Sequence, residues 1–316
     1  MRRTPQAAAI LLSVLMLFSG CGTEQGAKAR EDGKLSVYAS FYMMYDFAQK
    51  IGGDKAHITV MVPDGTEPHD WEPAAADIAG LQDADLFIYN GAGMEHWAED
   101  ILASLNPSSL IVAEASKGIA LREETHAQAE GEPEANDEHS GIDPIDPHVW
   151  LDPNNAKKEL ETIKNAFVQA DAQNASYYEA NYKKWAGEFD ALDEAFRAAL
   201  STLPKKEIIV AHEAYGYLCA AYGLTQIGIE GLAPDSEPDP GRMAEIIELA
   251  RLKGVTTIFF EELSSPDVAN AIAVEAGANT AVLSPIEGLT DEARAQGADY
   301  VSVMRKNLTA LKQALQ

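Results

Sequence analysis

The chain has 316 residues, 46% of them hydrophobic, which is enough for one or two domains with substantial cores. Its 50 Asp and Glu residues outnumber its 24 Lys and Arg residues. So acidic a surface would repel the phosphates of nucleic acid, and it argues against a nucleic-acid-binding protein. It is typical of a protein that attracts cations, but composition alone identifies no site.

The first twenty residues have the pattern of an export signal. Arg2 and Arg3 form a basic start, and an apolar run over residues 7–18 follows. That run is too short to span a bilayer comfortably and long enough for a signal peptide. We therefore expect residues 1–20 to be removed on export.

One of the two cysteines in the chain directly follows this signal. Small residues before Cys21 resemble a bacterial lipobox, in which Cys21 would be lipidated as the first residue of the exported protein. Phe18 departs from that pattern, where Leu is more usual, and the alternative is ordinary cleavage with an unmodified Cys21. We expect a lipid on Cys21 and a polar tether over residues 21–33. Cys219 lies in an apolar run, which predicts a small buried hydrophobe and no disulfide framework.

Beyond the tether, strand patterns alternate with helix patterns, as they do in parallel α/β units. The predicted strands lie at residues 35–39, 58–62, 85–89 and 110–113. The predicted helices run from the first strand through residue 51, and over residues 74–82 and 95–104. Residues 122–147 break the rhythm, because they are acidic and rich in Gly and Pro, and we expect a mobile surface loop there.

A long helix is predicted at about residues 174–202, after a shorter one at 154–170. Its apolar residues recur at steps of three and four, which is a good amphipathic pattern. At 1.5 Å per residue it would be roughly 40 Å long, so it could brace two lobes. Its apolar stripe consists of Tyr178, Tyr182, Trp185, Phe189, Leu192, Phe196 and Leu200.

A second α/β series follows the long helix. Its predicted strands are 207–211, 225–229, 255–260 and 280–283, and its predicted helices are 213–222, 241–253, 266–276 and 292–313. The two halves therefore have similar architecture. The sequence predicts an N-terminal α/β lobe over residues 34–173, a linking helix over 174–202 and a C-terminal α/β lobe over 203–316, both with parallel sheets.

Three of the seven histidines occur at places where an α/β protein binds ligands. His69 follows a predicted strand and His212 ends another, and ligands of open α/β sheets bind beyond the carboxyl ends of strands. His148 lies just before a predicted helix. Three imidazoles with a carboxylate are a donor set for four-coordinate zinc. No short-range metal motif is present, so three unrelated loop histidines remain the alternative at this point.

Five segments in order make the chain recognisable. They are Pro68-His69-Asp70-Trp71-Glu72-Pro73, the run Asp146–Pro153 with sequence DPHVWLDP, and Ala211-His212-Glu213-Ala214-Tyr215, together with residues 39–47 and 259–262. As an ordered set they closely resemble the metal-binding solute receptors of ABC transporters, in the zinc and manganese branch of that family.

The resemblance covers roughly residues 35–315. It implies two α/β lobes joined by one long helix, with a metal ion held at the lobe interface. On the matching motifs, His69 and His148 come from the first lobe and His212 from the second. The family's fourth ligand is a carboxylate that follows a late strand of the second lobe.

For that fourth ligand we choose Glu287, because residues 284–289 resemble the corresponding segment of zinc receptors. Asp291 is the second choice and a water molecule the third. Manganese receptors tend to replace one of the three histidines with a carboxylate, whereas this chain keeps all three, so zinc is favoured. Copper and nickel would also bind such a site in vitro.

Residues around these ligands have expected roles. Asp146 and Asp152 are expected to accept hydrogen bonds near His148 or to cap a helix. Zinc receptors often carry a metal-gathering loop, so His126 and His139 in the acidic loop form a possible accessory site; an acidic linker without such a role is the alternative.

The signal before Cys21 and the family resemblance together predict an exported, lipid-anchored zinc receptor, not an enzyme, in the periplasm or on the outer face of the cell membrane. It would act as a monomer and hand its metal to a transporter permease. A manganese receptor of the same family is the first alternative. A zinc metallohydrolase on the same histidines, with Glu213 or Glu287 as general base, is the alternative of another class.

Overall fold

The structure is a computed structural model that describes four stretches of the chain, residues 33–105, 110–123, 145–232 and 238–316. The predicted signal peptide, Cys21, nearly all of the tether, His126 and His139 lie outside the described residues. Within those four stretches, no helix is both long enough and apolar enough to cross a membrane.

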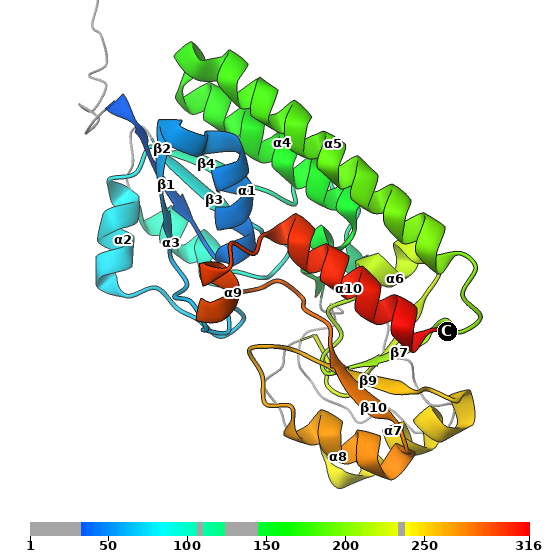
Figure 1. Cartoon of the computed structure of the whole chain (residues 1–316). Helices are drawn as coiled ribbons and strands as arrows, with labels where there is room; N and C mark the ends of the chain where they lie inside the picture. The colour runs from blue at the N-terminus through cyan, green and yellow to red at the C-terminus, as the bar shows by residue number, and fades with distance from the viewer. Residues whose placement is uncertain (1–32, 106–109, 124–144, 233–237) are drawn as a thin grey trace, which may run out of the picture.

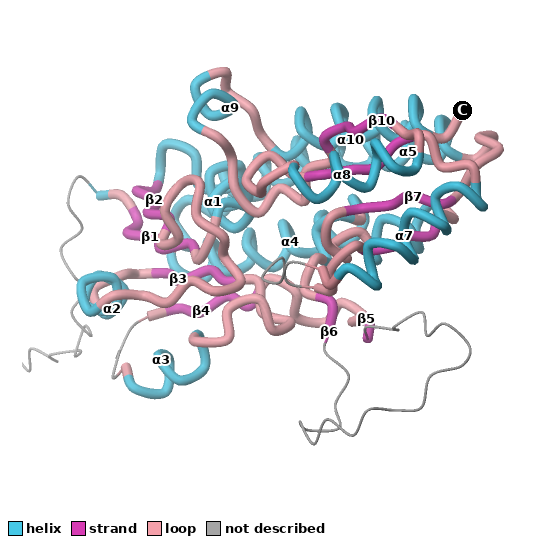
Figure 2. Tube along the Cα trace, turned by 90° about the horizontal axis from the view of Figure 1, so that it is seen from below, coloured by secondary structure: helices cyan, strands magenta, loops and turns pink. Residues whose placement is uncertain are grey.

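Each half of the chain forms a four-stranded parallel sheet (Figure 1 and Figure 2). The first sheet has the order β2-β1-β3-β4 and the second the order β10-β9-β7-β8. If the strands are renumbered 1 to 4 within each half, and the second sheet is read from β8 to β10, both sheets have the order 2-1-3-4. The predicted similarity of the two lobes therefore extends to their topology. The strands are β1 (Leu35–Ala39), β2 (Ala56–Val60), β3 (Leu86–Tyr89), β4 (Ile111–Glu114), β7 (Glu207–Val210), β8 (Thr225–Gly228), β9 (Thr257–Phe260) and β10 (Asn279–Val282).

The helices pack on the sheets and between the two lobes. They are α1 (Tyr42–Gly52), α2 (Ala75–Gln82), α3 (Ala98–Ser104), α4 (Pro153–Ala170), α5 (Ala175–Leu200), α6 (Gly216–Tyr222), α7 (Pro240–Lys253), α8 (Asp267–Ala276), α9 (Asp291–Ala295) and α10 (Tyr300–Ala314).

The long helix α5 touches both lobes, as its length predicts. Its 26 residues span about 39 Å at 1.5 Å per residue. Near its start, the side chain of Asn181 donates to the carbonyl of Ile51 in the first lobe at 2.9 Å. Near its end, the ring of Phe196 stacks on that of Tyr222 in the second lobe, with centroids 5.0 Å apart. Figure 1 shows α4 lying beside α5 along much of its length.

One hydrophobic core extends across both lobes. It takes up the inner faces of the two sheets and the buried stripe of α5, including Phe189 and Leu192. Two smaller clusters cover the outer faces, around Phe87 and Trp97 in the first lobe and around Ile209 and Ile258 in the second. Because the lobes pack on the same helices, their relative position is set by a continuous core and not by a flexible linker.

The structure corrects two predicted elements. The single helix expected over residues 292–313 is two helices, α9 and α10, because the chain turns at Gly297 with φ 72°. The side chain of Asp299 then caps α10 by accepting from the N–H of Ser302 at 2.9 Å. The predicted loop at 122–147 also begins and ends in regular structure, since β5 (Arg122–Glu123) pairs with β6 (Ile145–Asp146) in an antiparallel ladder.

Candidate metal centre

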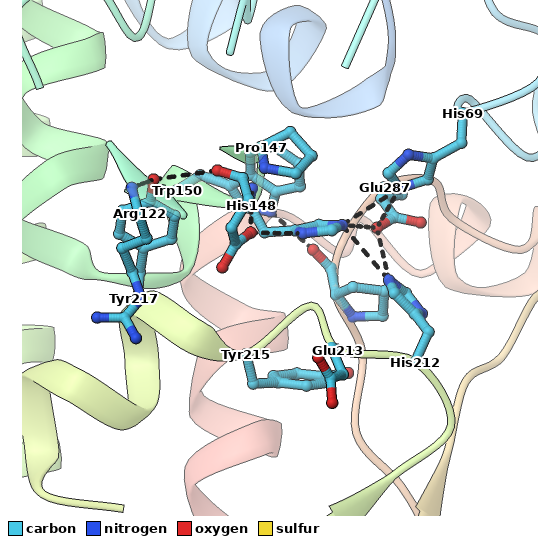
Figure 3. A network of polar contacts seen from close by, with 12 residues as sticks. His69, Arg122, Pro147, His148, Trp150, His212, Glu213, Tyr215, Tyr217 and Glu287 are labelled. Atoms are coloured by element: carbon cyan, nitrogen blue, oxygen red, sulfur yellow. Dashed lines mark hydrogen bonds and ion pairs between the residues drawn. The ribbon is translucent and has the colours of Figure 1, made fainter. Parts of the chain in front are cut away.

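Four side chains from distant parts of the chain converge between the lobes (Figure 3). The Nε2 atom of His148 lies 3.2 Å from that of His69 and 3.4 Å from that of His212. The Oε1 atom of Glu287 lies 2.9, 3.6 and 3.5 Å from the Nε2 atoms of His148, His69 and His212. Three nitrogen donors and one oxygen donor thus face one point.

These distances fit a tetrahedral metal ion. With metal–ligand bonds of about 2.0–2.1 Å, the ligand atoms of a zinc ion lie about 3.3–3.4 Å from one another. The five distances given above range from 2.9 to 3.6 Å around that value. The Oε1 of Glu287 is buried and faces the three imidazole nitrogens. A cation among the four atoms would satisfy it.

Each of the four residues lies beyond the carboxyl end of a strand or directly before a helix. His212 comes two residues after β7, and Glu287 follows β10. His69 follows β2 after a turn in which the N–H of Thr66 donates to the carbonyl of Pro63 at 3.2 Å. His148 stands between β6 and a single 3₁₀ turn, Val149–Leu151. The four side chains therefore converge in the crevice at the ends of parallel strands, which is where open α/β sheets bind their ligands.

The centre is closed on every side but one. The side chains of His148 and His212 are 0% exposed and that of Glu287 is 2% exposed, whereas that of His69 is 10% exposed. A metal ion at the centre would therefore be shielded from water, and the His69 side is the one nearest to solvent.

Asp146 orients His148. Its Oδ1 accepts the backbone N–H of His148 at 2.9 Å and lies 2.9 Å from the ring Nδ1. A proton on Nδ1 leaves the lone pair of Nε2 free to bind a metal, and a carboxylate partner also makes that nitrogen a stronger donor. Asp152, the other candidate, caps α4 instead by accepting from the N–H of Asn154 at 2.9 Å.

Glu261 has the same relation to His212. Its Oε1 lies 2.5 Å from the Nδ1 of His212, and both residues are buried. Glu261 lies in one of the recognisable segments, residues 259–262, but this motif alone predicts no role for it. Its position in the sequence could have indicated the role, because Glu261 directly follows a predicted strand, as His212 does. The pairing of β7 with β9 brings the ends of these two strands together.

The carboxylates control the charge of the centre. Burial lowers the pKa of His148, but hydrogen bonds to Asp146 and Glu287 outweigh it and the net pKa is raised. The pKa of His212 is raised well above its usual range, because Glu261 and Glu287 outweigh the effect of burial. Burial alone would raise the pKa of Glu287, yet its histidine partners hold it well below its usual range. Burial and the charge of Glu287 raise the pKa of Glu67 to about 8.

Three further residues near the motifs are not among the converging side chains. Asp291 is the first residue of α9 and is not one of the four converging side chains, so the second choice for the fourth ligand is not supported. His96 is half exposed and pairs with Glu72 at 3.6 Å. Trp71 packs against Trp97 with ring centroids 5.6 Å apart.

Trp150 packs against the centre, and Cys219 is buried, as expected. The indole ring of Trp150 lies 5.4 Å from the ring of His148 between centroids. Glu213 lines a cavity of about 240 Å³ with Arg122, Asp146 and Cys219, and is not among the four converging residues.

The sequence and the fold both match one family of metal receptors. A sequence model described as "Zinc-uptake complex component A periplasmic" (ZnuA) matches residues 37–314. The chain belongs to this family. ZnuA proteins are solute-binding receptors and not enzymes, so the family offers no support for a hydrolase.

Relatives agree over nearly the whole chain. The high-affinity zinc uptake system protein ZnuA of Bacillus subtilis is 39% identical over 97% of this chain and 96% of its own length. The zinc-binding lipoprotein AdcA of Streptococcus pneumoniae is 37% identical over 96% of this chain, which spans 60% of AdcA. The zinc(II)-bound ZnuA-like domain of that AdcA has the same fold, with a TM-score of 0.76 and 36% identity, over 90% of this chain and 99% of the domain.

Proposed function

We propose that this protein is an extracytoplasmic receptor that captures one zinc ion and delivers it to the permease of an ABC transporter. The observation that carries the proposal is the convergence of three imidazole nitrogens and one carboxylate oxygen at distances that fit tetrahedral zinc. His69, His148, His212 and Glu287 are the proposed ligands. Membership of a zinc-uptake family supports the same cargo.

The donor set favours zinc over manganese. Manganese prefers oxygen ligands and higher coordination numbers, whereas this centre offers three nitrogens and one oxygen. Two of the three imidazoles also have a carboxylate on the nitrogen that faces away from the metal, which strengthens them as donors. Copper and nickel bind nitrogen donors too, so the physiological metal depends on which metal ions are available to the protein as well as on the geometry of the site.

The centre is suited to holding a metal and not to hydrolysis. A catalytic zinc site keeps one position open for water, whereas four protein ligands complete the tetrahedron here. Glu287 is itself a proposed ligand, and Glu213 lines a different cavity. Neither is therefore placed as a general base beside a metal-bound water.

We further propose that Cys21 carries a lipid, which holds the exported protein at the outer face of the membrane or in the periplasm, and that the receptor acts as a monomer. The support for the anchor is the basic and apolar signal before Cys21 and the lipoprotein relative AdcA. A Cys21→Ser variant should move from the membrane fraction to the soluble fraction. Equal membrane retention of both forms would contradict the anchor.

Metal analysis of the chain without residues 1–20 tests the proposed ligands. We expect one zinc ion per chain in the parent protein after dialysis against submicromolar zinc. Alanine at any one of the three histidines, or Glu287→Gln, should leave less than one ion per chain under the same conditions. His96→Ala is the matched control, because His96 is half exposed and outside the centre. Full zinc content in all four ligand variants would overturn the site.

A further inference from the structure

The segment that carries Glu287 has an unusual backbone. Ile286, directly before Glu287, has φ 64°, in the left-handed region. A β-branched residue is a genuine outlier there, because its side chain crowds the neighbouring carbonyl. The side chain of Ile286 is nevertheless fully buried. Surrounding contacts must therefore hold this conformation in place.

Contacts from the second half of the chain fix the segment as far as Ser284. The hydroxyl of Tyr215 donates to the carbonyl of Leu283 at 2.5 Å. The side chain of Asn307 accepts from the N–H of Ser284 at 3.0 Å and donates to its carbonyl at 2.7 Å. The backbone up to Ser284 is therefore held by Tyr215, directly before α6, and by Asn307 of α10.

The Pro285–Ile286 peptide group has a polar contact at each end: the N–H of Ile286 donates to the hydroxyl of Ser284 at 3.3 Å, and the carbonyl of Pro285 is bound by a residue of the first half of the chain. The indole Nε1–H of Trp150 donates to the carbonyl of Pro285 at 2.7 Å. Trp150 lies two residues after His148, and its own carbonyl accepts from the hydroxyl of Tyr300 at 2.7 Å. The segment that carries His148 thus holds the backbone directly before Glu287.

The first backbone angles of this segment that the sequence leaves free are ψ of Pro285 and φ of Ile286, on the two sides of one peptide group. The ring of Pro285 fixes its own φ, and the residue before a proline is restricted to extended backbone, which restrains Ser284. Rotation of the Pro285–Ile286 peptide group, with Ile286 passing from left-handed to right-handed backbone, would therefore break the hydrogen bond from Trp150 and redirect Glu287 while leaving residues 283 and 284 in place.

We propose that the Trp150–Pro285 hydrogen bond is a latch that holds Ile286 in its left-handed conformation and thereby positions Glu287 on the metal. When the latch opens, Ile286 relaxes and Glu287 leaves the metal, which remains on three histidines with an open position for an incoming ligand. Trp150 and Ile286 are positioning residues for metal release. This inference rests on the proposed zinc-receptor function.

Trp150→Phe tests the latch, since it removes the N–H donor and keeps an aromatic ring. The zinc dissociation rate, measured by transfer to an excess of a chromogenic chelator, should rise about tenfold, as expected for the loss of one buried hydrogen bond. Trp97→Phe is the control, because Trp97 is a buried indole in a separate core cluster. A Trp150→Phe rate equal to that of the parent would overturn the latch.

Cobalt(II) substitution gives a signature that a general loss of stability would not produce. Four-coordinate cobalt absorbs visible light far more strongly than five- or six-coordinate cobalt. With saturating cobalt, the visible spectrum of Trp150→Phe should shift from that of the parent toward that of Glu287→Gln, and the spectrum of Trp97→Phe should not. A Trp150→Phe spectrum identical to that of the parent would show that Glu287 stays on the metal without the latch.

Ile286→Gly and Ile286→Ala form a matched pair for the backbone. Both remove the same buried side chain, but only Ala keeps the cost of the left-handed conformation. If that conformation is needed only when Glu287 binds the metal, the Gly variant should bind zinc about fivefold more tightly than the Ala variant. Equal affinities would mean that Ile286 does not change conformation on release.

These outcomes separate the latch from the function on which it rests. A parent chain that takes up no stoichiometric zinc would defeat the proposed function itself. A parent chain that binds zinc, with Trp150 and Ile286 variants that behave as their controls, would defeat the latch alone.

Discussion

The Oε1 of Glu287 lies 2.9 Å from the Nε2 of His148, although the two residues belong to different halves of the chain. The contact lies beyond the carboxyl ends of strands, where the shared core brings the two lobes together. A carboxylate and an imidazole this close share either a proton or a metal ion. Protons and metal ions therefore compete for this pair, and the zinc affinity and the stability of the protein should depend on both pH and zinc concentration.

Zinc should stabilise the fold strongly. A ligand at a thousandfold excess over its dissociation constant stabilises the native state by about 4 kcal/mol, which corresponds to roughly 8–16 °C in the melting temperature. Calorimetry with and without zinc measures the shift, and addition of a chelator should reverse it. His148→Ala should remove most of it. A zinc-induced shift in His148→Ala as large as in the parent would contradict a role for this histidine as a ligand.

Zinc affinity should rise with pH through the neutral range. In the metal-free chain, carboxylates outweigh burial and raise the pKa of His148 and His212, so protons compete with zinc even above the usual histidine pKa of about 6.5. Competition titrations from about pH 5.5 to 8.5 measure this. A profile that is flat above pH 6.5 would show that these histidines are already free of protons there.

The carboxylates behind the histidines should matter nearly as much as the ligands. Asp146→Asn and Glu261→Gln replace the partner of an imidazole Nδ1 by a weaker acceptor. Such changes typically cost about 10–100-fold in metal affinity. Glu262→Gln is the control, because Glu262 is adjacent to Glu261 and exposed. If Glu261→Gln binds zinc as tightly as Glu262→Gln, the pairing with His212 has no effect on the metal.

Lys50 should stabilise the contact between α1 and the start of α10. Its Nζ lies 2.8 Å from a carboxylate oxygen of Asp46 and 2.8 Å from one of Asp299, and its side chain is 5% exposed. Burial raises the pKa of Asp46 in spite of Lys50, so Lys50→Ala would leave a buried carboxyl without its partner. We expect a loss of about 3–5 kcal/mol in the free energy of unfolding.

Lys184→Ala is the control for this prediction. Lys184 also lies over the ring of Trp185, at 4.6 Å against 4.3 Å for Lys50, but it is exposed. Urea denaturation should therefore leave Lys184→Ala close to the parent. Similar small losses in both variants would mean that the two carboxylates do not depend on Lys50.

Glu159 should make the fold less stable as the pH rises. It is fully buried, neither carboxylate oxygen has a hydrogen-bond partner within the described residues, and burial raises its pKa well above the usual value, with Glu95 adding to the effect. Because the folded state holds this proton more tightly than the unfolded state, its stabilising contribution is present below about pH 4.5 and is lost as the pH rises toward the raised pKa.

Glu159→Gln should remove that dependence, so the stability of this variant relative to the parent should increase with pH. Glu161→Gln, an exposed change on the same helix, should not have this effect. Urea titrations of all three proteins at acidic and neutral pH make the comparison. A constant difference between Glu159→Gln and the parent would show that Glu159 does not change its protonation on folding.

The sequence by itself determined the elements and the three candidate histidines. Period-2 and period-3.6 patterns are local, so they predicted the eight strands of the two parallel sheets and the buried stripe of α5. His69, His148 and His212 stood in distinctive segments, and the ordered set of those segments indicated the family. The break at Gly297 was missed because a single glycine inside a helical pattern is often tolerated.

Only the tertiary structure showed which carboxylates lie at the candidate metal centre. Glu287 and Asp291 both follow a late strand in the sequence, and only the packed lobes bring the first to His148. The partnership of Glu261 with His212 and the bond from Trp150 to Pro285 also join residues far apart in the chain. Such contacts depend on how two sheets and a shared core fit together, and local sequence patterns carry no information about that fit.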